Sequence, residues 1–224
     1  MLIRSWNVFH GRTSPPGQRV HLRAMVELIS RDAPDVVCLQ ELPLWSLAQL
    51  HEWSGMTVLS AVAKRTPVPR WLGGVLQRHD PIRFRSGVTG QANAILLAPQ
   101  HVPLEHRAVR ISVQGRERRV CHAVRLADVV VGNVHASNEF RYVEVPRGEL
   151  TRAHALVESM AAAGQARVLA GDFNLRDPEL PGPNIDHIVA AEVEHGALEV
   201  WPEERRLHNG AVLSDHAPVE MRIG

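Results

Sequence analysis

Short apolar stretches bounded by turn-forming residues recur along the chain, and this pattern predicts a protein rich in β-strands. The expected strands cover Leu2–Val8, Asp35–Gln40, Met56–Ala63, Ala92–Leu97, Glu105–Val113, Arg119–Leu126, Asp128–His135, Arg167–Ala170, Ile185–Ala190, Ala197–Val200 and Ala217–Ile223. The polar stretch Gln114–Arg116 predicts a hairpin turn between two of these strands.

Apolar residues spaced near the helical period predict helices over Arg19–Arg31 and Glu149–Met160, and a shorter helix over Trp45–Trp53. Residues Lys64–Gly90 break both periods because prolines and glycines recur there, so we expect a long surface loop. Strands with interspersed helices predict a mixed α/β layered domain, and with no interior linker residues 1–224 form a single domain.

A helix, a short polar gap and an apolar strand occur twice, over Arg19–Gln40 and Glu149–Gly171. Each strand is followed by an acid, Glu41 in the first and Asp172 in the second. Two matching halves of this kind would place their acids around a central cleft.

The composition excludes several classes of protein. Apolar residues make up 45% and charged residues 22%, which excludes disorder as the main state. The formal net charge of +1 excludes a strongly basic nucleic-acid-binding chain, so any electrostatic attraction must come from local patches. The apolar runs are too short for a transmembrane segment, and Met1–Asn7 does not resemble a secretory signal. Cys38 and Cys121 fit no disulfide or zinc pattern, so we expect a cytoplasmic protein.

Amides, acids and histidines gather at the ends of the predicted strands. The segments are Ser5–Asn7, Leu39–Glu41, Gly132–His135, Gly171–Asn174 and Ser214–His216, and a further segment, Asn184–His187, begins a strand. Burying such groups is unfavourable unless each finds a partner, and they can do so by meeting around one cation. Oxygen donors predominate in the set Asn7, Glu41, Asp172, Asn174 and Asp215, which favours Mg²⁺ or Mn²⁺ over zinc.

The order of these motifs resembles the endonuclease/exonuclease/phosphatase superfamily, which includes DNase I-like nucleases, AP endonucleases, bacterial sphingomyelinases and inositol polyphosphate 5-phosphatases. The motifs are Trp-Asn, Gln-Glu, Asn-x-His, Gly-Asp-Phe-Asn, Ile-Asp-His and Ser-Asp-His, and they extend nearly from end to end. The resemblance implies an α/β (α+β) fold, a four-layer αββα sandwich with two packed, mostly antiparallel β-sheets.

The resemblance also implies roles for individual residues. Asn7 and Glu41 match metal-binding positions, and Asp215 lies near or on the metal. Asp172 matches the aspartate that orients or activates the attacking water, and Asn174 the amide that helps to hold it. His135 matches the histidine that contacts the scissile phosphate. His216 matches the terminal catalytic histidine, and Asp186 the carboxylate that pairs with it. Substrate contacts are expected at Asn93, Asn133 and Arg141.

The resulting hypothesis is a Mg²⁺- or Mn²⁺-dependent phosphodiesterase, in the first place a nuclease-like enzyme. Two alternatives remain open, a hydrolase for a small or lipid-linked phosphate head group and a non-catalytic binding module on the same fold. The arginines of Lys64–Gly90, with Trp71 beside Arg70, suit a nucleic acid backbone, an anionic lipid surface or simply solvent. The sequence leaves the oligomeric state open.

Overall fold

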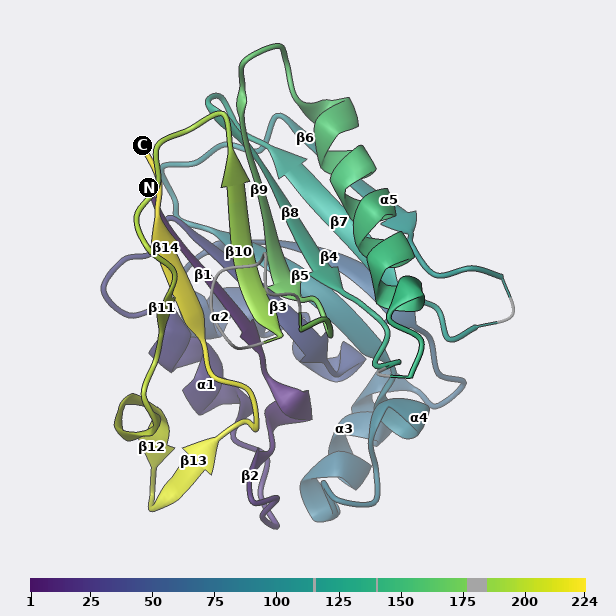
Figure 1. Cartoon of the computed structure of the whole chain (residues 1–224). Helices are drawn as coiled ribbons and strands as arrows, with labels where there is room; N and C mark the ends of the chain where they lie inside the picture. Colours follow the sequence, from purple (N-terminus) through teal and green to yellow (C-terminus); the bar gives the residue numbers. More distant parts are fainter. Residues whose placement is uncertain (115, 140, 177–184) are drawn as a thin grey trace.

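The computed structural model describes residues 1–114, 116–139, 141–176 and 185–224, and two packed β-sheets form its centre (Figure 1). In spatial order, the six-stranded sheet consists of β11 (Glu199–Val200), β14 (Val219–Arg222), β1 (Leu2–Asn7), β3 (Val36–Leu42), β5 (Gln91–Leu97) and β4 (Thr57–Lys64). The five-stranded sheet consists of β10 (Asp186–Ala191), β9 (Ala166–Asp172), β8 (Val129–His135), β7 (Val120–Arg125) and β6 (Glu105–Arg110). A small third sheet contains β12 (Leu207–His208), β13 (Ala211–Leu213) and β2 (Thr13–Ser14).

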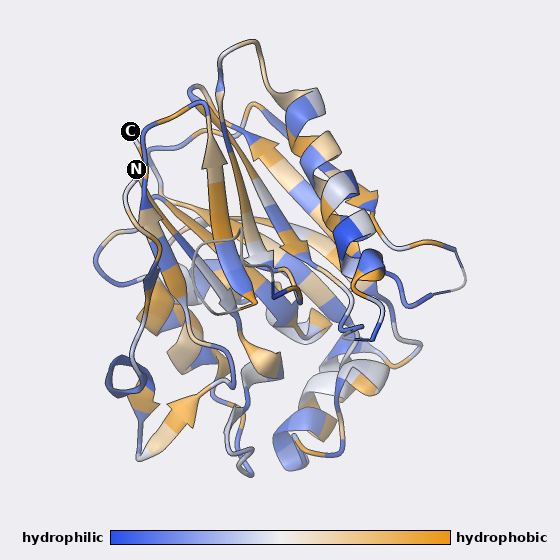
Figure 2. Ribbon diagram, in the orientation of Figure 1, coloured by the Kyte–Doolittle hydropathy of each residue, from blue (hydrophilic) through white to orange (hydrophobic). Residues whose placement is uncertain are grey.

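Helices cover the outer face of each large sheet and complete four layers. Helices α1 (Leu22–Ile29) and α2 (Leu50–Ser54) share an apolar cluster with the six-stranded sheet, and α5 (Glu144–Met160) shares another with the five-stranded sheet. A third apolar cluster fills the space between the sheets, whose strands are largely orange in Figure 2. The expected four-layer αββα sandwich is therefore confirmed.

Two parallel strand pairs bring functional side chains to one edge of the sandwich. Strand β1 pairs with β3 so that Asn7 lies opposite Gln40, and β8 pairs with β9 so that His135 lies opposite Asp172. The connection from β1 to β3 contains α1, and the connection from β8 to β9 contains α5. Since paired parallel strands end at the same edge, both halves deliver their polar residues to neighbouring places.

Buried polar side chains join the two sheets near this edge. The amide nitrogen Nδ2 of Asn133 in β8 donates to the carbonyl oxygens of Leu39 and Ala94, at 3.0 and 2.8 Å. Its Oδ1 accepts a hydrogen bond of 2.9 Å from Nε2 of Gln40 in β3. These bonds compensate the burial of the amides and fix how the two sheets face each other.

The expectation of a long loop over Lys64–Gly90 is wrong, because the segment contains α3 (Arg70–His79) and the short α4 (Ser86–Thr89). Two adjacent glycines of α3 serve close packing. A Cβ at Gly73 would lie 3.3 Å from the carbonyl oxygen of Val88, and one at Gly74 only 3.1 Å from Cγ of Trp45. Tertiary contact therefore outweighs the weak helix propensity of glycine here.

Other boundaries also differ from the expected ones. Helix α5 begins at Glu144, five residues earlier than expected, because Pro146 is compatible with a first helical turn. The helix expected over Trp45–Trp53 is split into the 3₁₀ turn η2 (Leu44–Ser46) and α2. Strand β6 ends at Arg110, short of the expected Val113. Gly115 of the predicted turn and Asn184 of the last predicted motif lie outside the described residues.

No helix within the described part of the chain is both long enough and apolar enough to cross a membrane.

Candidate active site

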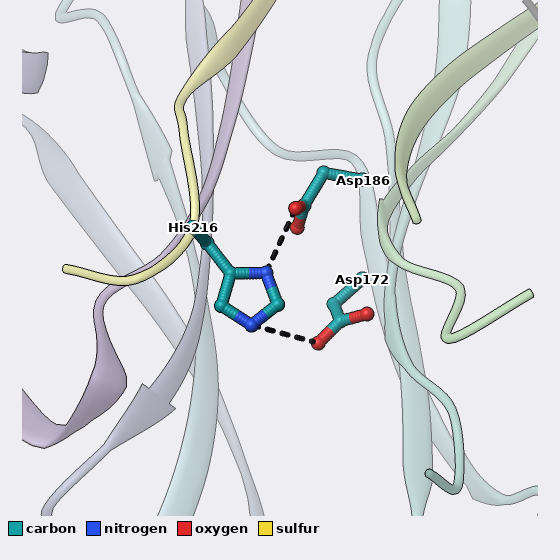
Figure 3. A group of neighbouring side chains, drawn as sticks. All are labelled: Asp172, Asp186 and His216. Carbon is teal, nitrogen blue, oxygen red and sulfur yellow. Dashed lines mark hydrogen bonds and ion pairs between the residues drawn. The ribbon is translucent and has the colours of Figure 1, made fainter. Parts of the chain in front are cut away.

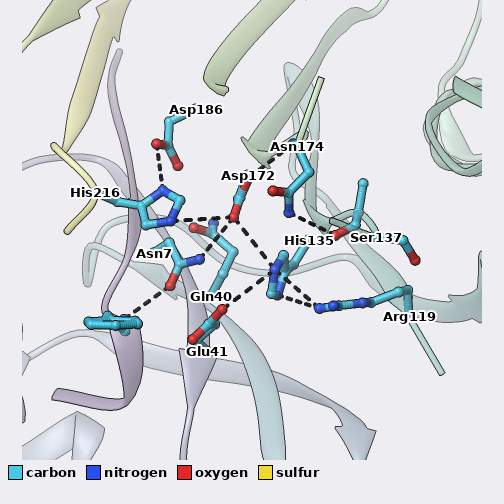
Figure 4. A network of polar contacts seen from close by, with 12 residues as sticks. Asn7, Gln40, Glu41, Arg119, His135, Ser137, Asp172, Asn174, Asp186 and His216 are labelled. Carbon is cyan, nitrogen blue, oxygen red and sulfur yellow. Dashed lines mark hydrogen bonds and ion pairs between the residues drawn. The ribbon is translucent and has the colours of Figure 1, made fainter. Parts of the chain in front are cut away.

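The predicted catalytic and metal-binding residues converge at the edge where β1, β3, β8 and β9 end (Figure 4). Contacts of 4.0 Å or less link these residues into one cluster. Its members are Asn7, Glu41, His135, Asp172, Asn174, Asp186, Asp215 and His216. The geometric basis of the sequence hypothesis, the convergence of residues far apart in the chain on one place, is thus present.

His216 is held between carboxylates (Figure 3). Its Nδ1 lies 2.8 Å from Oδ2 of Asp186, and its Nε2 lies 3.9 Å from Oδ2 of Asp172 and 4.0 Å from Oδ1 of Asp215. Burial disfavours the charged imidazole, but the hydrogen bond and charge of Asp186, with the other two carboxylates, raise the pKa of His216 to about 10. His216 is therefore a cation at neutral pH.

The backbone around His216 is also fixed. Nε1 of Trp6 donates to the carbonyl oxygen of His216 at 2.9 Å, and the His216 N–H donates to Oγ of Ser214 at 3.1 Å. The Ser214 hydroxyl in turn donates to the carbonyl oxygen of Asn7 at 2.7 Å. These bonds tie the segment before β14 to the end of β1, so the imidazole is positioned by the rigid sheet.

Asp172 is a nearly inaccessible carboxyl group at the centre of the cluster, with 1% of its surface exposed. Nδ2 of Asn7 donates to its Oδ2 at 2.9 Å, and the backbone N–H of Asn174 donates to its Oδ1 at 3.0 Å. Burial and the nearby charge of Asp186 raise the pKa of Asp172 to about 7, against the opposing effects of His216 and Asn7. A proton acceptor with such a pKa is suited to general base catalysis.

His135, by contrast, is neutral. Burial lowers the pKa of His135 well below its usual value, and the charges of Arg119, His216 and His10 lower it further. Nε2 of Gln91 lies 3.0 Å from Nδ1 of His135, and Nη1 of Arg119 lies 3.1 Å from both ring nitrogens. Because the Gln91 amide donates at Nδ1 and carboxylates lie near Nε2, we assign the imidazole proton to Nε2.

The protonated Nε2 of His135 then faces carboxylates. It lies 3.5 Å from Oδ2 of Asp172 and 3.7 Å from Oε1 of Glu41. The N–H therefore points into the cluster, where it can donate a hydrogen bond to a phosphate oxygen.

Glu41 extends into the cleft because the backbone of β3 is irregular at this point. The pairing of β3 with β5 shifts register between Leu39 and Leu42, and Glu41 adopts a left-handed φ of 57°. Such irregularities redirect a side chain and occur often at functional sites. The Glu41 side chain keeps 20% of its surface exposed, and its Oε2 lies 3.4 Å from Nε2 of His10. It is the most accessible acid of the cluster after Asp215, which is 42% exposed.

The donor chemistry of the cluster fits a hard divalent cation. The carboxylate of Glu41 and the amide of Asn7 can supply oxygen, and ligand atoms of Asp172, Asp186 and His216 lie within 4.8 Å of one another. Within the described residues, Oδ1 of Asp186 is buried without a hydrogen-bond partner. Burial in the first place, and then the nearby charge of Asp186, raise the pKa of Asp172.

A glycine sets the spacing between the two strands that carry His135 and Asp172. Gly171 has a φ of 145°, and a Cβ at this position would lie 1.9 Å from the carbonyl oxygen of Val134. Only glycine permits this approach. His135 and Asp172 follow directly in each strand, so their separation depends on it.

The three predicted substrate contacts lie outside this cluster. Asn133 is completely buried between the sheets, where its amide bonds to protein groups, as described above. Asn93 is 1% exposed, and its Nδ2 donates to the carbonyl oxygen of Val120 at 3.3 Å. Both positions fit a structural role between the sheets. Arg141 is exposed, shortly before α5.

The structure adds three residues to the site that sequence reasoning did not place there. His10 faces Glu41, and Gln91 and Arg119 face His135. His10 lies in the 3₁₀ turn η1 (Phe9–Gly11), and Arg119 belongs to an arginine-rich stretch that gave no indication of the direction of its side chain. Gln91 directly precedes a predicted strand and carried no chemical signal of its own.

Comparison with known proteins gives one family match. A profile of the Endonuclease/Exonuclease/phosphatase family matches residues 5–216. None of the curated proteins matches the chain.

Solved structures share the fold over the full chain. An endonuclease/exonuclease/phosphatase from Beutenbergia cavernae DSM 12333 superposes with a TM-score of 0.70 and 19% identity, covering 100% of this chain and 72% of that one. A mannosyl-6-phosphatase from Bacteroides thetaiotaomicron VPI-5482 superposes with a TM-score of 0.68 and 16% identity, covering 100% of this chain and 99% of that one. TDP2 from C. elegans superposes with a TM-score of 0.67 and 14% identity, covering 99% of this chain and 74% of that one. At these identities the similarity concerns the fold.

Proposed function

Since this chain belongs to the endonuclease/exonuclease/phosphatase family, we propose that it is a divalent-metal-dependent phosphodiesterase with nuclease-like activity. The observation that carries this proposal is the pairing of His216 with Asp186 at 2.8 Å beside the buried carboxyl group of Asp172. A cation, a neutral imidazole and a poised carboxylate within one cluster can act together on a phosphate ester.

The cation in this proposal is Mg²⁺ or Mn²⁺, held by Glu41 and Asn7 with Asp215 nearby. When bound, it would neutralise charge on the phosphate and polarise the phosphorus for attack. The oxygen-rich donor set supports a hard cation over zinc.

The protein's own residues divide the remaining work. Asp172 orients the attacking water and accepts its proton, for which a pKa of about 7 is suitable. His216, cationic through Asp186, stabilises the negative charge that develops on the phosphate oxygens. His135 donates its Nε2–H to another phosphate oxygen, and Asn174 helps to hold the water.

A second candidate is a phosphatase or phosphodiesterase for a small or lipid-linked phosphate ester. It is favoured by the mannosyl-6-phosphatase, whose fold this chain matches over 99% of that protein's length. The same cluster would serve either substrate, since the chemistry at phosphorus is the same.

The experiment that tests the proposal is a substrate panel under controlled metal conditions. DNA, RNA, abasic DNA, sphingomyelin, inositol phosphates and mannose 6-phosphate are each incubated with Mg²⁺, Mn²⁺ or EDTA. We expect cleavage of a nucleic acid with either metal and none in EDTA. Release of phosphate or a head group alone would select the second candidate. A folded protein inert toward the whole panel and without divalent-cation binding in calorimetry would support a non-catalytic binding module.

We also propose that the protein works in the cytoplasm as a single domain. The buried thiols of Cys38 and Cys121 are free, which fits a reducing compartment. Fractionation of cells that produce the tagged protein tests the location, and one cooperative melting transition tests the single domain.

A further inference from the structure

A groove lies beside the candidate site, between α3 and the segment that follows β3. Its volume is about 380 Å³, and its walls include Trp45, Gln49, Arg70, Trp71, Val75 and Arg78. Trp45 belongs to η2, which begins three residues after Glu41. The groove thus adjoins the chain segment that follows Glu41.

The walls of this groove combine aromatic rings with positive charge. Trp71 is 70% exposed, whereas tryptophan side chains are on average largely buried. The guanidinium carbon of Arg78 lies 5.3 Å from the centre of the Trp45 ring, and Arg70 directly precedes Trp71. Gly74 lets α3 pack closely on Trp45, because a Cβ there would lie 3.1 Å from its Cγ, so the exposed indole of the groove is that of Trp71.

The charge of the surrounding segment differs from that of the whole chain. Residues 64–90 contain six lysines and arginines but only one acid, Asp80, whereas the chain as a whole has a net charge of +1. Arg65, Arg70, Arg78, Arg83 and Arg85 are all exposed. The positive potential is therefore concentrated on this side of the site, which favours a polyanion.

We propose that this groove binds one unpaired nucleotide of a single-stranded nucleic acid, with the base on Trp71 and the adjacent phosphates on Arg70 and Arg78. Aromatic stacking combined with arginine contacts to the backbone is the usual chemistry of single-strand recognition. That the strand is also the substrate rests on the proposed function, whereas the binding itself does not.

The groove is connected to the site by a short chain of hydrogen bonds. Nε1 of Trp45 donates to Oε1 of the buried Gln77 at 2.7 Å, and Nε2 of Gln77 donates to the carbonyl oxygen of His10 at 2.8 Å. The His10 side chain faces Glu41. Gln77 and His10 thus connect the wall of the groove at Trp45 with Glu41 of the cluster.

The shape of the surface favours a nucleotide over a lipid membrane. Only Trp71 and Val75 of α3 expose large apolar side chains, and they border a concave groove. Helices that bind membranes present a broader apolar face that enters the acyl boundary. Two apolar side chains are few for such insertion, but one exposed indole and two guanidinium groups match a base and its adjacent phosphates in number and kind.

Binding is tested with a fluorescently labelled oligo(dT) of about 15 nucleotides, by fluorescence anisotropy in EDTA so that no cleavage occurs. We expect Trp71→Ala to raise the Kd roughly tenfold. Arg70→Gln and Arg78→Gln should each reduce the salt dependence of binding by about one phosphate contact. The matched controls are Val102→Ala, at a residue 69% exposed elsewhere, and Arg222→Gln at another exposed arginine.

The catalytic function is measured separately with a small diester, bis(p-nitrophenyl) phosphate. Trp71→Ala should hydrolyse it at the wild-type rate, with an increase confined to the KM for an oligonucleotide. An unchanged Kd for oligo(dT) in Trp71→Ala, or an equal loss in Val102→Ala, would overturn the proposal. Loss of binding to anionic phosphatidylglycerol vesicles, with oligo(dT) binding intact, would instead identify a membrane surface. Absence of hydrolysis by a wild-type protein that binds oligo(dT) through Trp71 would refute the proposed function alone.

Discussion

The two βαβ halves of the molecule are built alike but present their functional groups differently. In the first half β1, α1 and β3 deliver Asn7 and Glu41, and in the second half β8, α5 and β9 deliver His135 and Asp172. Glu41 lies in β3 at an irregular position, has a left-handed φ and remains 20% exposed. Asp172 continues its regular strand and is 1% exposed.

This difference separates two chemical tasks that both need a carboxylate. An accessible acid can exchange a ligand with solvent, which suits holding a cation. A buried acid with a pKa raised to about 7 can take up and release a proton, which suits activating water. One supersecondary unit, used twice, thus supplies an electrostatic half, which holds the cation through Glu41, and a proton-transfer half, which activates water through Asp172.

The largest effect is expected from removing the proton-transfer carboxylate. Asp172→Asn should lower turnover about 10³-fold or more, since the water loses its base. The folded state should become more stable at pH 8, by about 1–2 kcal/mol, because a buried carboxylate is replaced by a neutral amide. Turnover assays and thermal melts check both parts.

The sign of the stability change follows from the raised pKa of Asp172. In the wild type the folded state loses stability as pH rises from the usual value near 4 through about 7, because the unfolded chain ionises first. The variant lacks this loss, so its advantage should be greatest at pH 8 and vanish near pH 4. A constant advantage over that range would argue against the burial explanation.

In the electrostatic half, Glu41→Gln should weaken Mn²⁺ binding by at least about tenfold and lower turnover about 10²-fold. Because Glu41 is partly exposed, the melting temperature without metal should change little. Calorimetric titration with Mn²⁺ measures the affinity, and Glu105→Gln, at a partly exposed acid of β6, serves as the control. Unaltered Mn²⁺ affinity would remove Glu41 from the cation site.

A smaller effect is expected from changing the partner of His216, which precedes β14 and lies beside Asp172. Asp186→Asn should remove the hydrogen bond and charge that raise the pKa of His216 to about 10. The imidazolium would then be lost at lower pH, so the alkaline limb of the activity profile should move downward by about one to two pH units. Rates at saturating substrate across pH 6–11 check this shift, and an identical limb in the variant would contradict the pairing.

The smallest effect concerns Arg119 beside His135. Its charge lowers the pKa of His135, so Arg119→Gln should raise that pKa and move the acid limb of the activity profile upward by less than about one pH unit. The His135 ring signals in NMR report the pKa directly. Arg118→Gln, at the neighbouring exposed arginine, should leave them unchanged.

The sequence is sufficient to predict the strands of the two large sheets and the acids and histidines at their ends, but it does not reveal the short strands β2, β12 and β13 of the small sheet. Buried strands are visible as apolar runs, and Asn7, Glu41, Asp172 and His216 stand at their ends in recognisable motifs. Because strand order and direction bring these ends to one edge, local pattern combined with family resemblance was enough to find the cluster. The same reasoning anticipated that His216 pairs with Asp186.

The remaining features depend on contacts across the sandwich, which local pattern does not contain. Gln91 reaches His135 from β5 and Arg119 from the loop before β7, and no spacing in the sequence relates them. Asn133 was predicted to contact the substrate and lies two residues before His135, yet its amide is hydrogen-bonded to Gln40 of the facing sheet. In α3 the glycines looked like helix breakers, although close packing on Trp45 is what they permit.

The contact at Gly171 means that the geometry of the site depends on the absence of a Cβ atom at this position. A methyl group there would push β8 from β9 while every acid and imidazole of the cluster stayed in the sequence. Among related chains, this position would therefore discriminate working enzymes from inactive descendants that have kept their catalytic side chains and lost only the distance between them.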